Sequence, residues 1–165
     1  MNKRNYKIEI SNKKNVVDIF GSGIKHDIID LGINGVTSVN VSHIYRIQGN
    51  INISGIRSLC KNLLVDPITQ KYKIYIEHKD SSNTKKNTKV CSNRYEIEVW
   101  FKPGVTDTVG ESVLKSSSDM GIKNITEIKT GTKYIITGKN LKYKDIEKIC
   151  NRLLANSVIQ SYQIN

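Results

Sequence analysis

The sequence predicts an α+β fold of two tandem βαββαβ units, each a mainly antiparallel sheet with two helices on one face, packed as a pseudo-dimer. The first observation behind this prediction is a repeat: residues 95–110 and residues 6–21 share one plan of an alternating strand, a turn and a helix start. The second is that stretches with alternating apolar residues are interleaved with stretches that carry one apolar stripe at helical spacing.

The two halves align over almost their whole length. The offset is 89 residues as far as Gly49 and Gly138, and 90 residues from Ile56 and Ile146 onward, so the alignment needs one gap. This indicates an internal duplication. We therefore expect a first unit at residues 1–77, a polar and basic linker at 78–93 and a second unit at 94–165. Units of this size are marginally stable alone, so each should support the other.

Each half contains the same predicted elements in the same order. Strands are predicted at 6–11, 36–41, 44–48, 72–76, 95–101, 125–130, 133–137 and 158–164. The first helix follows Asp18, carries Phe20, Ile24, Ile28 and Leu31 on one stripe, and ends before Gly32. The other helices are predicted at 54–64, 108–120 and 143–154. A turn near Ser42-His43 should separate the two middle strands of the first half.

The formal net charge of +11 allows a nucleic acid, an acidic protein or a phosphorylated ligand as a partner. An AT-rich coding bias toward Lys, Asn and Ile explains the same charge without any partner. The basic residues are spread out and aromatic residues are few, with no cluster of the kind that binds single strands. Nucleic acid is therefore not the expected partner.

Three cysteines do not suggest a disulfide framework. Cys60 and Cys150 occupy equivalent positions on apolar helix faces and are expected to be small core residues, whereas Cys91 lies in the linker. No signal peptide and no apolar run long enough for a bilayer is visible, so we expect a cytoplasmic protein without membrane contact.

A search for catalytic chemistry finds little. The three histidines have no ligand spacing, and no zinc-protease, phosphate-loop or dinucleotide motif is present. Glu9 and Glu98 are expected to be solvent-facing strand residues. Asp18 and Asp107 are explained as helix N-caps. Gly21 and Gly110, in the first helical turn of each half, indicate a close approach either by a partner or within the fold.

The second half resembles the PurS family, the small subunit of phosphoribosylformylglycinamidine synthase. The resemblance is carried by Lys102-Pro103-Gly104-Val105, Asp107, Gly110, Gly121, Leu153-Leu154-Ala155-Asn156, Val158-Ile159 and Tyr162. These residues match the K-P-G-V-x-D-x-x-G opening and the L-L-A-N-P-V-I-E-x-Y ending of that family. Each motif alone is weak, but the pair at this separation is fairly specific.

The first half is similar to the same family at fewer positions. It keeps Lys13, Val16, Asp18, Gly21, Gly32, Leu63-Leu64 and Pro67-Ile68. It has Lys14-Asn15 in place of the Pro-Gly of the opening, and the closing Glu of the family is replaced by Gln70 and Gln160 in the two halves.

The resemblance implies a non-catalytic assembly subunit. Such a subunit joins an ATP-using synthetase subunit to a glutaminase subunit for glutamine-dependent ammonia transfer in purine biosynthesis. No activity of this chain alone and no cofactor are expected. Further self-association is left open. The residues expected to contact partners or to carry the motif are Lys102, Pro103, Gly104, Asp107, Gly110, Asn156, Lys13, Asp18 and Gly21. The alternative is a tandem regulatory module that binds a small ligand.

Overall fold

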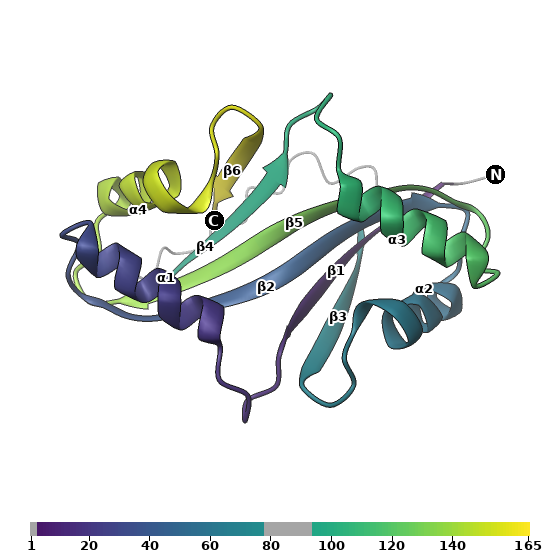
Figure 1. The fold of residues 1–165 in the computed structure, drawn as a ribbon, viewed down its shortest axis with the longest axis horizontal. Coiled ribbons are helices and arrows are strands. Elements are labelled where there is room, and N and C mark those ends of the chain that lie inside the picture. The colour runs from purple at the N-terminus through teal and green to yellow at the C-terminus, as the bar shows by residue number, and fades with distance from the viewer. Residues whose placement is uncertain (1–2, 78–93) are drawn as a thin grey trace. The chain divides into compact units, whose positions relative to one another are not determined.

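A computed structural model describes residues 3–77 and 94–165 of the chain (Figure 1). The elements of the first half are β1 (Arg4–Asn12), α1 (Ile19–Asp30), β2 (Val36–Gly49), α2 (Ile53–Leu59), the π-helical turn η1 (Cys60–Leu64) and β3 (Gln70–Glu77). Those of the second half are β4 (Arg94–Phe101), α3 (Thr108–Asp119), β5 (Ile125–Gly138), α4 (Tyr143–Ile149), η2 (Cys150–Leu154) and β6 (Gln160–Ile164). The predicted linker, with Cys91, lies outside the described residues.

The strands hydrogen-bond in the order β3-β1-β2-β5-β4-β6. The pairs β1/β3, β4/β5 and β4/β6 are antiparallel. The α+β fold class of two tandem units is confirmed, and so is the βαββαβ order if the two halves of each long strand, β2 and β5, are counted separately.

The predicted turn near Ser42-His43 is wrong. β2 continues through these residues without reversing, and β5 likewise continues through Gly131-Thr132. The physical reason is that the two ends of each long strand pack in different compact units. The imperfect apolar alternation, which we interpreted as two strands, therefore belongs to a single continuous strand. The predicted strand at 158–164 also begins later, at Gln160, because the preceding residues form a turn.

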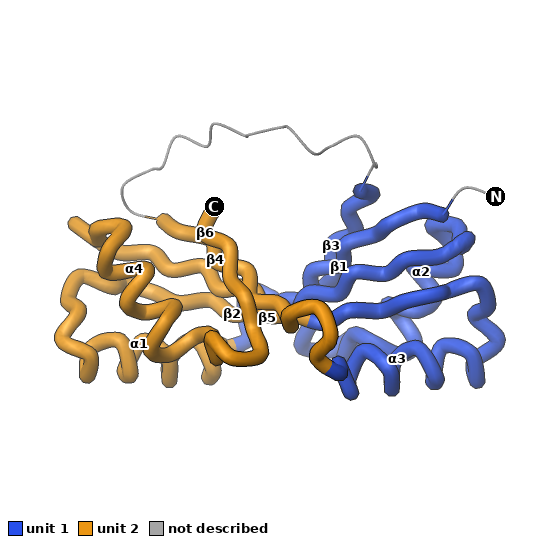
Figure 2. The backbone as a smooth tube through the Cα atoms, turned by 90° about the horizontal axis from the view of Figure 1, so that it is seen from above, with its two compact units in different colours: residues 1–16, 43–85, 106–130 blue, residues 17–42, 86–105, 131–165 orange. Residues whose placement is uncertain are grey.

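The chain forms two compact units that do not coincide with the two repeats (Figure 2). Unit 1 contains residues 1–16, 43–85 and 106–130, and unit 2 contains residues 17–42, 86–105 and 131–165. Each repeat therefore contributes its first helix to the unit of the other repeat. α1 belongs to unit 2 with β4, β6 and α4, and α3 belongs to unit 1 with β1, β3 and α2. β2 and β5 each run through both units.

The core of unit 1 lies between its strands and the pair α2 and α3. Its buried residues are Tyr6, Ile8, Ile10, Ile47, Ile51, Ile56, Leu59, Cys60 and Ile128. The core of unit 2 lies between its strands and the pair α1 and α4. Its buried residues include Ile28, Ile33, Val36 and Val39 from the first repeat and Tyr95, Ile97, Val99, Ile136, Ile146, Ile149, Cys150 and Leu154 from the second. In each unit the helices cover one face of the strands (Figure 1).

The predicted apolar stripe of α1 is wrong at its first residue. Ile28 is fully buried and Ile24 packs against the core, but the Phe20 side chain is 75% exposed. Gly21 is the residue of the first turn that faces the sheet, since a Cβ atom there would lie 2.1 Å from the Val39 carbonyl oxygen. This contact sets the rotation of the helix and turns Phe20 outward.

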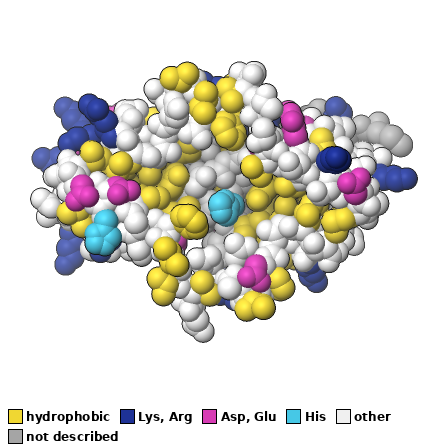
Figure 3. Space-filling model, viewed as in Figure 1, with side chains coloured by type: hydrophobic (Ala, Val, Ile, Leu, Met, Phe, Trp, Pro, Cys, Tyr) yellow, Lys and Arg dark blue, Asp and Glu magenta, His cyan; other side chains and the backbone are white. Residues whose placement is uncertain are grey.

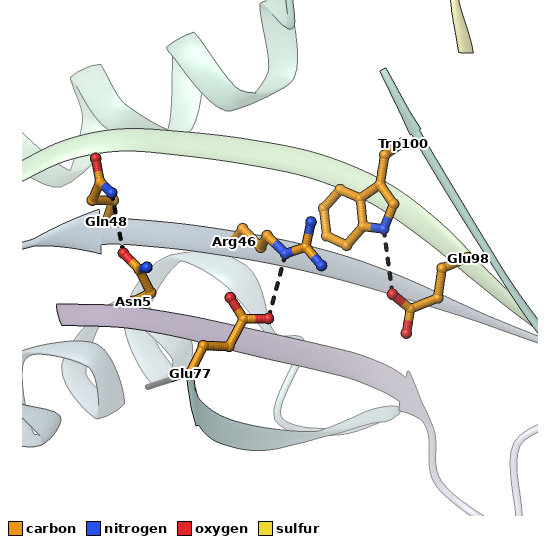
Figure 4. A network of polar contacts seen from close by, with 6 residues as sticks. All are labelled: Asn5, Arg46, Gln48, Glu77, Glu98 and Trp100. Atoms are coloured by element: carbon orange, nitrogen blue, oxygen red, sulfur yellow. Dashed lines mark hydrogen bonds and ion pairs between the residues drawn. The ribbon is translucent and has the colours of Figure 1, made fainter. Parts of the chain in front are cut away.

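The prediction that Glu9 and Glu98 face solvent is also wrong, because both are buried. The Glu98 carboxylate accepts a hydrogen bond of 3.3 Å from the Trp100 indole N–H (Figure 4). In unit 1, the same figure shows the ion pair between Arg46 and Glu77 at 3.4 Å. Glu98, Arg46 and Glu77 are thus each engaged in a polar side-chain contact.

Candidate functional site

The candidate motif residues of unit 2 meet at one exposed corner, which we call the unit-2 tip: residues 102–105, which follow β4, and residues 156–159, which precede β6. The Lys102 ammonium donates a hydrogen bond of 2.5 Å to the Ser157 carbonyl oxygen, and the Lys102 amide donates one of 2.9 Å to the Ile159 carbonyl oxygen. Four of the candidate residues, Lys102, Pro103, Gly104 and Asn156, therefore belong to one local structure.

Unit 1 has an equivalent corner, the unit-1 tip, at residues 13–16 and 66–69. The Lys13 ammonium donates a hydrogen bond of 2.6 Å to the Pro67 carbonyl oxygen, and the Lys13 amide donates one of 2.9 Å to the Thr69 carbonyl oxygen. The recurring lysine thus has the same intramolecular role in both repeats: it clamps one turn of the tip to the other.

The two tips differ in their first turn. In the unit-2 tip the Val105 amide donates to the Lys102 carbonyl at 3.1 Å, and Gly104 has a φ of +86°. Proline followed by a residue with positive φ is the arrangement of a type II turn, in which glycine is favoured at the second central position. The unit-1 tip closes with the same kind of hydrogen bond, from Val16 to Lys13, without a positive φ at Asn15. The Pro-Gly pair therefore gives the second repeat a different corner.

The second turn of each tip is held by its own side chains. The Asn156 side-chain oxygen accepts from the Val158 amide at 3.0 Å, and Gln160 accepts from the Asn156 amide at 2.9 Å. Asp66 and Gln70 make the same contacts in unit 1. At this position the side chain only has to supply an acceptor oxygen. Glutamine and glutamate both have one, so Gln70 and Gln160 can replace the glutamate of the family motif.

These turns expose two apolar side chains that belong to the family resemblance but were not among the residues expected to contact partners. Ile68 is 81% exposed and Val158 is 78% exposed, at equivalent positions of the two tips. Turns usually present polar residues, so a large apolar side chain kept at the same exposed position in both repeats is the feature that could have identified them.

Asp18 and Asp107 are N-caps, as predicted, and they also hold the long strands. The Asp107 carboxylate accepts from the Gly110 amide at 2.8 Å and from the Thr130 amide at 2.5 Å. Asp18 accepts from the amides of Gly21 and Val41 in the same way. Each aspartate thus joins a helix start to the strand on which that helix packs.

Gly21 and Gly110 pack against the same strands. A Cβ atom on Gly110 would lie 2.4 Å from the Ile128 carbonyl oxygen, which matches the clash described for Gly21. Tight packing inside each unit accounts for both glycines. The motif of the second repeat is divided between the units: Asp107 and Gly110 belong to unit 1, and Lys102 belongs to unit 2.

Unit 1 also contains a groove between η1 and α3, with a volume of about 310 Å³. Leu63, Leu64 and Val113 supply apolar surface, and Tyr45 and Ser112 contribute hydroxyl groups. Burial, with a smaller contribution from the Asp107 charge, raises the pKa of Tyr45. The Tyr45 hydroxyl is therefore a neutral hydrogen-bonding group at physiological pH.

Neither buried cysteine is poised for chemistry. Burial raises the pKa of Cys60 and of Cys150 to about 12, in the second case with help from the Glu147 charge, so both thiols stay protonated near neutral pH. Across residues 3–77 and 94–165, no three His, Cys, Asp or Glu side chains come together in a way that could hold a metal ion. No helix in this part of the chain is long and apolar enough to cross a membrane.

The fold and its tips define a class: a tandemly duplicated α+β protein whose recurring motif residues build turns, caps and helix packing. A family model described as PurS, phosphoribosylformylglycinamidine (FGAM) synthase, matches the chain twice, over residues 5–78 and 94–165. The chain belongs to the PurS family.

Two relatives bear the same name, phosphoribosylformylglycinamidine synthase subunit PurS. The protein of Archaeoglobus fulgidus is 32% identical over 73 residues, which are 42% of this chain and 91% of the relative. The protein of Methanocaldococcus jannaschii is 31% identical over 72 residues, which are 41% of this chain and 87% of the relative. A relative of this length corresponds to a single repeat, so this chain is a tandem form of the family.

Proposed function

We propose that this chain is a non-catalytic assembly subunit of phosphoribosylformylglycinamidine synthase that bridges the synthetase and glutaminase subunits for glutamine-dependent ammonia transfer. Family membership over both repeats supports the pathway and the enzyme. The roles of the motif residues support the non-catalytic proposal. The lysines hold the tips, the aspartates cap helices and the glycines allow close helix packing.

The observation that carries the proposal is the pair of built, exposed tips. Each tip is fixed by a lysine clamp and by a side-chain acceptor at its second turn, and each displays an apolar residue, Ile68 or Val158, to solvent. Exposed apolar side chains on a rigid frame are suited to binding another protein, because little conformational freedom is lost on association. Two such tips on one chain suit a bridging role.

The test is binding to purified synthetase and glutaminase subunits of the same organism, studied separately and together. The proposal predicts that the chain binds both and that all three co-elute in gel filtration. The matched variants Ile68→Ser and Val158→Ser should keep the fold and weaken binding. A wild-type chain that binds neither subunit would reject the proposal.

The groove between η1 and α3 favours one second candidate, a small-ligand-binding module. Its hydroxyl groups and apolar walls are suited to a small neutral or weakly polar ligand. Calorimetric titration of the isolated chain with amino acids and nucleotides tests this candidate. Saturable binding that is abolished by Ser112→Leu, a change that fills the groove, would support it; no heat of binding would reject it.

A further inference from the structure

The first turn of α1 exposes large apolar side chains. Val17, just before the helix, is 73% exposed, Ile19 is 77% exposed and Phe20 is 75% exposed. On the helix-bearing face in Figure 3, hydrophobic side chains are grouped over the region of this helix. Neighbouring apolar side chains exposed to this degree indicate a surface that another molecule covers.

The fold itself does not require these residues. The equivalent helix α3 packs in the same way, with the same capping aspartate and the same buried glycine, yet its matching residues are Thr106, Thr108 and Val109. α3 thus keeps one exposed apolar residue at these positions, Val109 at 54%, where α1 has three.

A second, independent observation is Gly23, which lies inside α1 and is exposed. A Cβ atom at this position would meet nothing within 4 Å, in contrast to the clash at Gly21. Glycine is a poorer helix former than every residue except proline. The matching residue of α3 is Ser112, so a side chain is tolerated there. Nothing in the chain's own packing explains Gly23.

Gly23 and the apolar side chains lie on one surface. Phe20 and Ile19 precede Gly23 by three and four residues, which places all three on neighbouring turns of one helix face. α1 also contacts η2, on which Leu153 is 37% exposed. The result is an apolar surface with a low point at Gly23, where the backbone of another molecule can approach closely.

The charge of the chain argues for an acidic occupant and against a second copy. Every copy carries a formal net charge of +11, so copies repel one another. Arg152 is exposed on η2 beside Leu153, where the first repeat has Asn62. Asp18 lies between Val17 and Ile19, but its carboxylate is bound by the Gly21 and Val41 amides, and the next acidic side chain is Asp27, one turn beyond Gly23.

We propose that Val17, Ile19, Phe20 and Gly23, here called the α1 patch, form the docking surface for an acidic subunit of the same enzyme complex. The inference rests on the proposed function and adds which surface binds. Phe20 enters an apolar recess of the partner, the partner backbone passes over Gly23, and Arg152 pairs with a partner carboxylate at the rim. Since α3 has Thr106, Thr108 and Ser112 at three of these four positions, the two repeats present different surfaces to the two partners.

The test measures the affinity of the full chain for each purified subunit, together with its melting temperature. Phe20→Ser should leave the melting temperature within about 2 °C and weaken binding to one subunit about tenfold or more. Gly23→Ala should raise the melting temperature, because alanine is the better helix former, and yet weaken binding. The matched controls are Val109→Ser and Ser112→Ala on α3, which should not change the affinity for that subunit.

Binding to that subunit should also weaken with added salt, and weaken less steeply for Arg152→Asn. The inference is overturned if Phe20→Ser and Gly23→Ala bind both subunits as the wild type does, or if these variants change only self-association in sedimentation experiments. A wild-type chain that binds neither subunit would instead reject the proposed function. The two failures are therefore distinguishable.

Discussion

At the scale of single residues, the recurring positions of the two repeats have mostly structural roles. Three glycines of helix starts show this most clearly: Gly21 and Gly110 face a strand carbonyl oxygen, whereas Gly23 faces open space. The same residue type is therefore required by packing at Gly21 and not at Gly23, and only the local distances distinguish the two positions.

Gly21→Ala should destabilise the chain by about 2–3 kcal/mol, since the new methyl group must displace the Val39 carbonyl from its place in the strand. Gly110→Ala should behave in the same way toward Ile128. Urea unfolding followed by circular dichroism measures both. Gly23→Ala serves as the control and should be neutral or stabilising; an equal loss at all three positions would contradict the packing argument.

The paired lysines allow a sharper comparison. Lys13→Met and Lys102→Met each remove one hydrogen bond to a tip carbonyl, so each should cost about 0.5–1.5 kcal/mol of unfolding free energy. The Lys102-Pro103-Gly104 corner is proposed to make the better-preserved partner contact, so Lys102→Met should weaken complex formation more. Equal losses of affinity by the two variants, measured by titration against the purified subunits, would contradict this asymmetry.

The carboxylate of Glu96 should make stability depend on pH. Burial acts to raise its pKa, but the hydrogen bond and charge of Lys133, with the charge of Arg94, outweigh burial and hold the pKa below its ordinary value. Ionised Glu96 therefore stabilises the folded state near neutral pH, and this contribution is lost as the pH falls through the folded-state pKa. Glu96→Gln should be less stable than wild type near pH 7 and equally stable in strong acid. A difference that does not change with pH in urea titrations would be inconsistent with this account.

At the scale of elements, the helices were the most predictable part of the sequence. Asp18 and Asp107 mark helix starts with their capping hydrogen bonds, and Gly32 marks an end with a φ of +78°. The apolar stripe on 54–64 predicted one helix, which the structure divides into α2 and η1. Local side-chain chemistry determines the caps and the helix ends, so the sequence alone was sufficient to place the helices, although it did not predict the π-helical turn.

The long strands were not predictable in the same way. Polar residues at Ser42-His43 interrupt the alternation of β2, and a turn is the usual meaning of such an interruption. Here it marks the passage of one strand between two cores, which depends on residues of the other repeat. The tips were foreseen only in part: the motif residues Lys102 and Asn156 were identified, but their lysine clamp joins segments 55 residues apart and follows only from the fold.

The turn of the unit-2 tip makes a prediction of its own. Gly104→Ala should destabilise the chain by about 1 kcal/mol, because a φ of +86° disfavours any side chain although no atom stands in its way. Thermal unfolding of this variant beside Asn15→Ala, at the matching turn without positive φ, provides the measurement. A larger loss at Asn15 would contradict the assigned turn types.

At the scale of the whole molecule, neither repeat has a complete core of its own. The core of unit 2 takes Ile28 and Val39 from the first repeat and Ile97 and Ile146 from the second. Residues 1–77 and residues 94–165 produced separately should therefore be unfolded or self-associated, and should form a folded one-to-one complex when mixed. Sedimentation and circular dichroism of the fragments check this expectation. If each fragment folds as a stable monomer, the assignment of α1 and α3 to the units of the opposite repeats would be contradicted.

The fused chain also explains why the two halves can differ. Covalent linkage keeps the two repeats together without an association step, so surfaces such as the α1 patch and the Pro-Gly corner can diverge while the shared caps and glycines are kept. Division of partner contacts between two unequal halves is the functional consequence we propose.

We propose above that this chain is the assembly subunit that couples the two active subunits of the synthase. The most direct measurement is the rate of glutamine-dependent phosphoribosylformylglycinamidine formation by the purified synthetase and glutaminase subunits, with and without this chain. We expect no activity of the chain alone and a glutamine-dependent rate that requires its addition. An unchanged glutamine-dependent rate in its absence would contradict the proposed role.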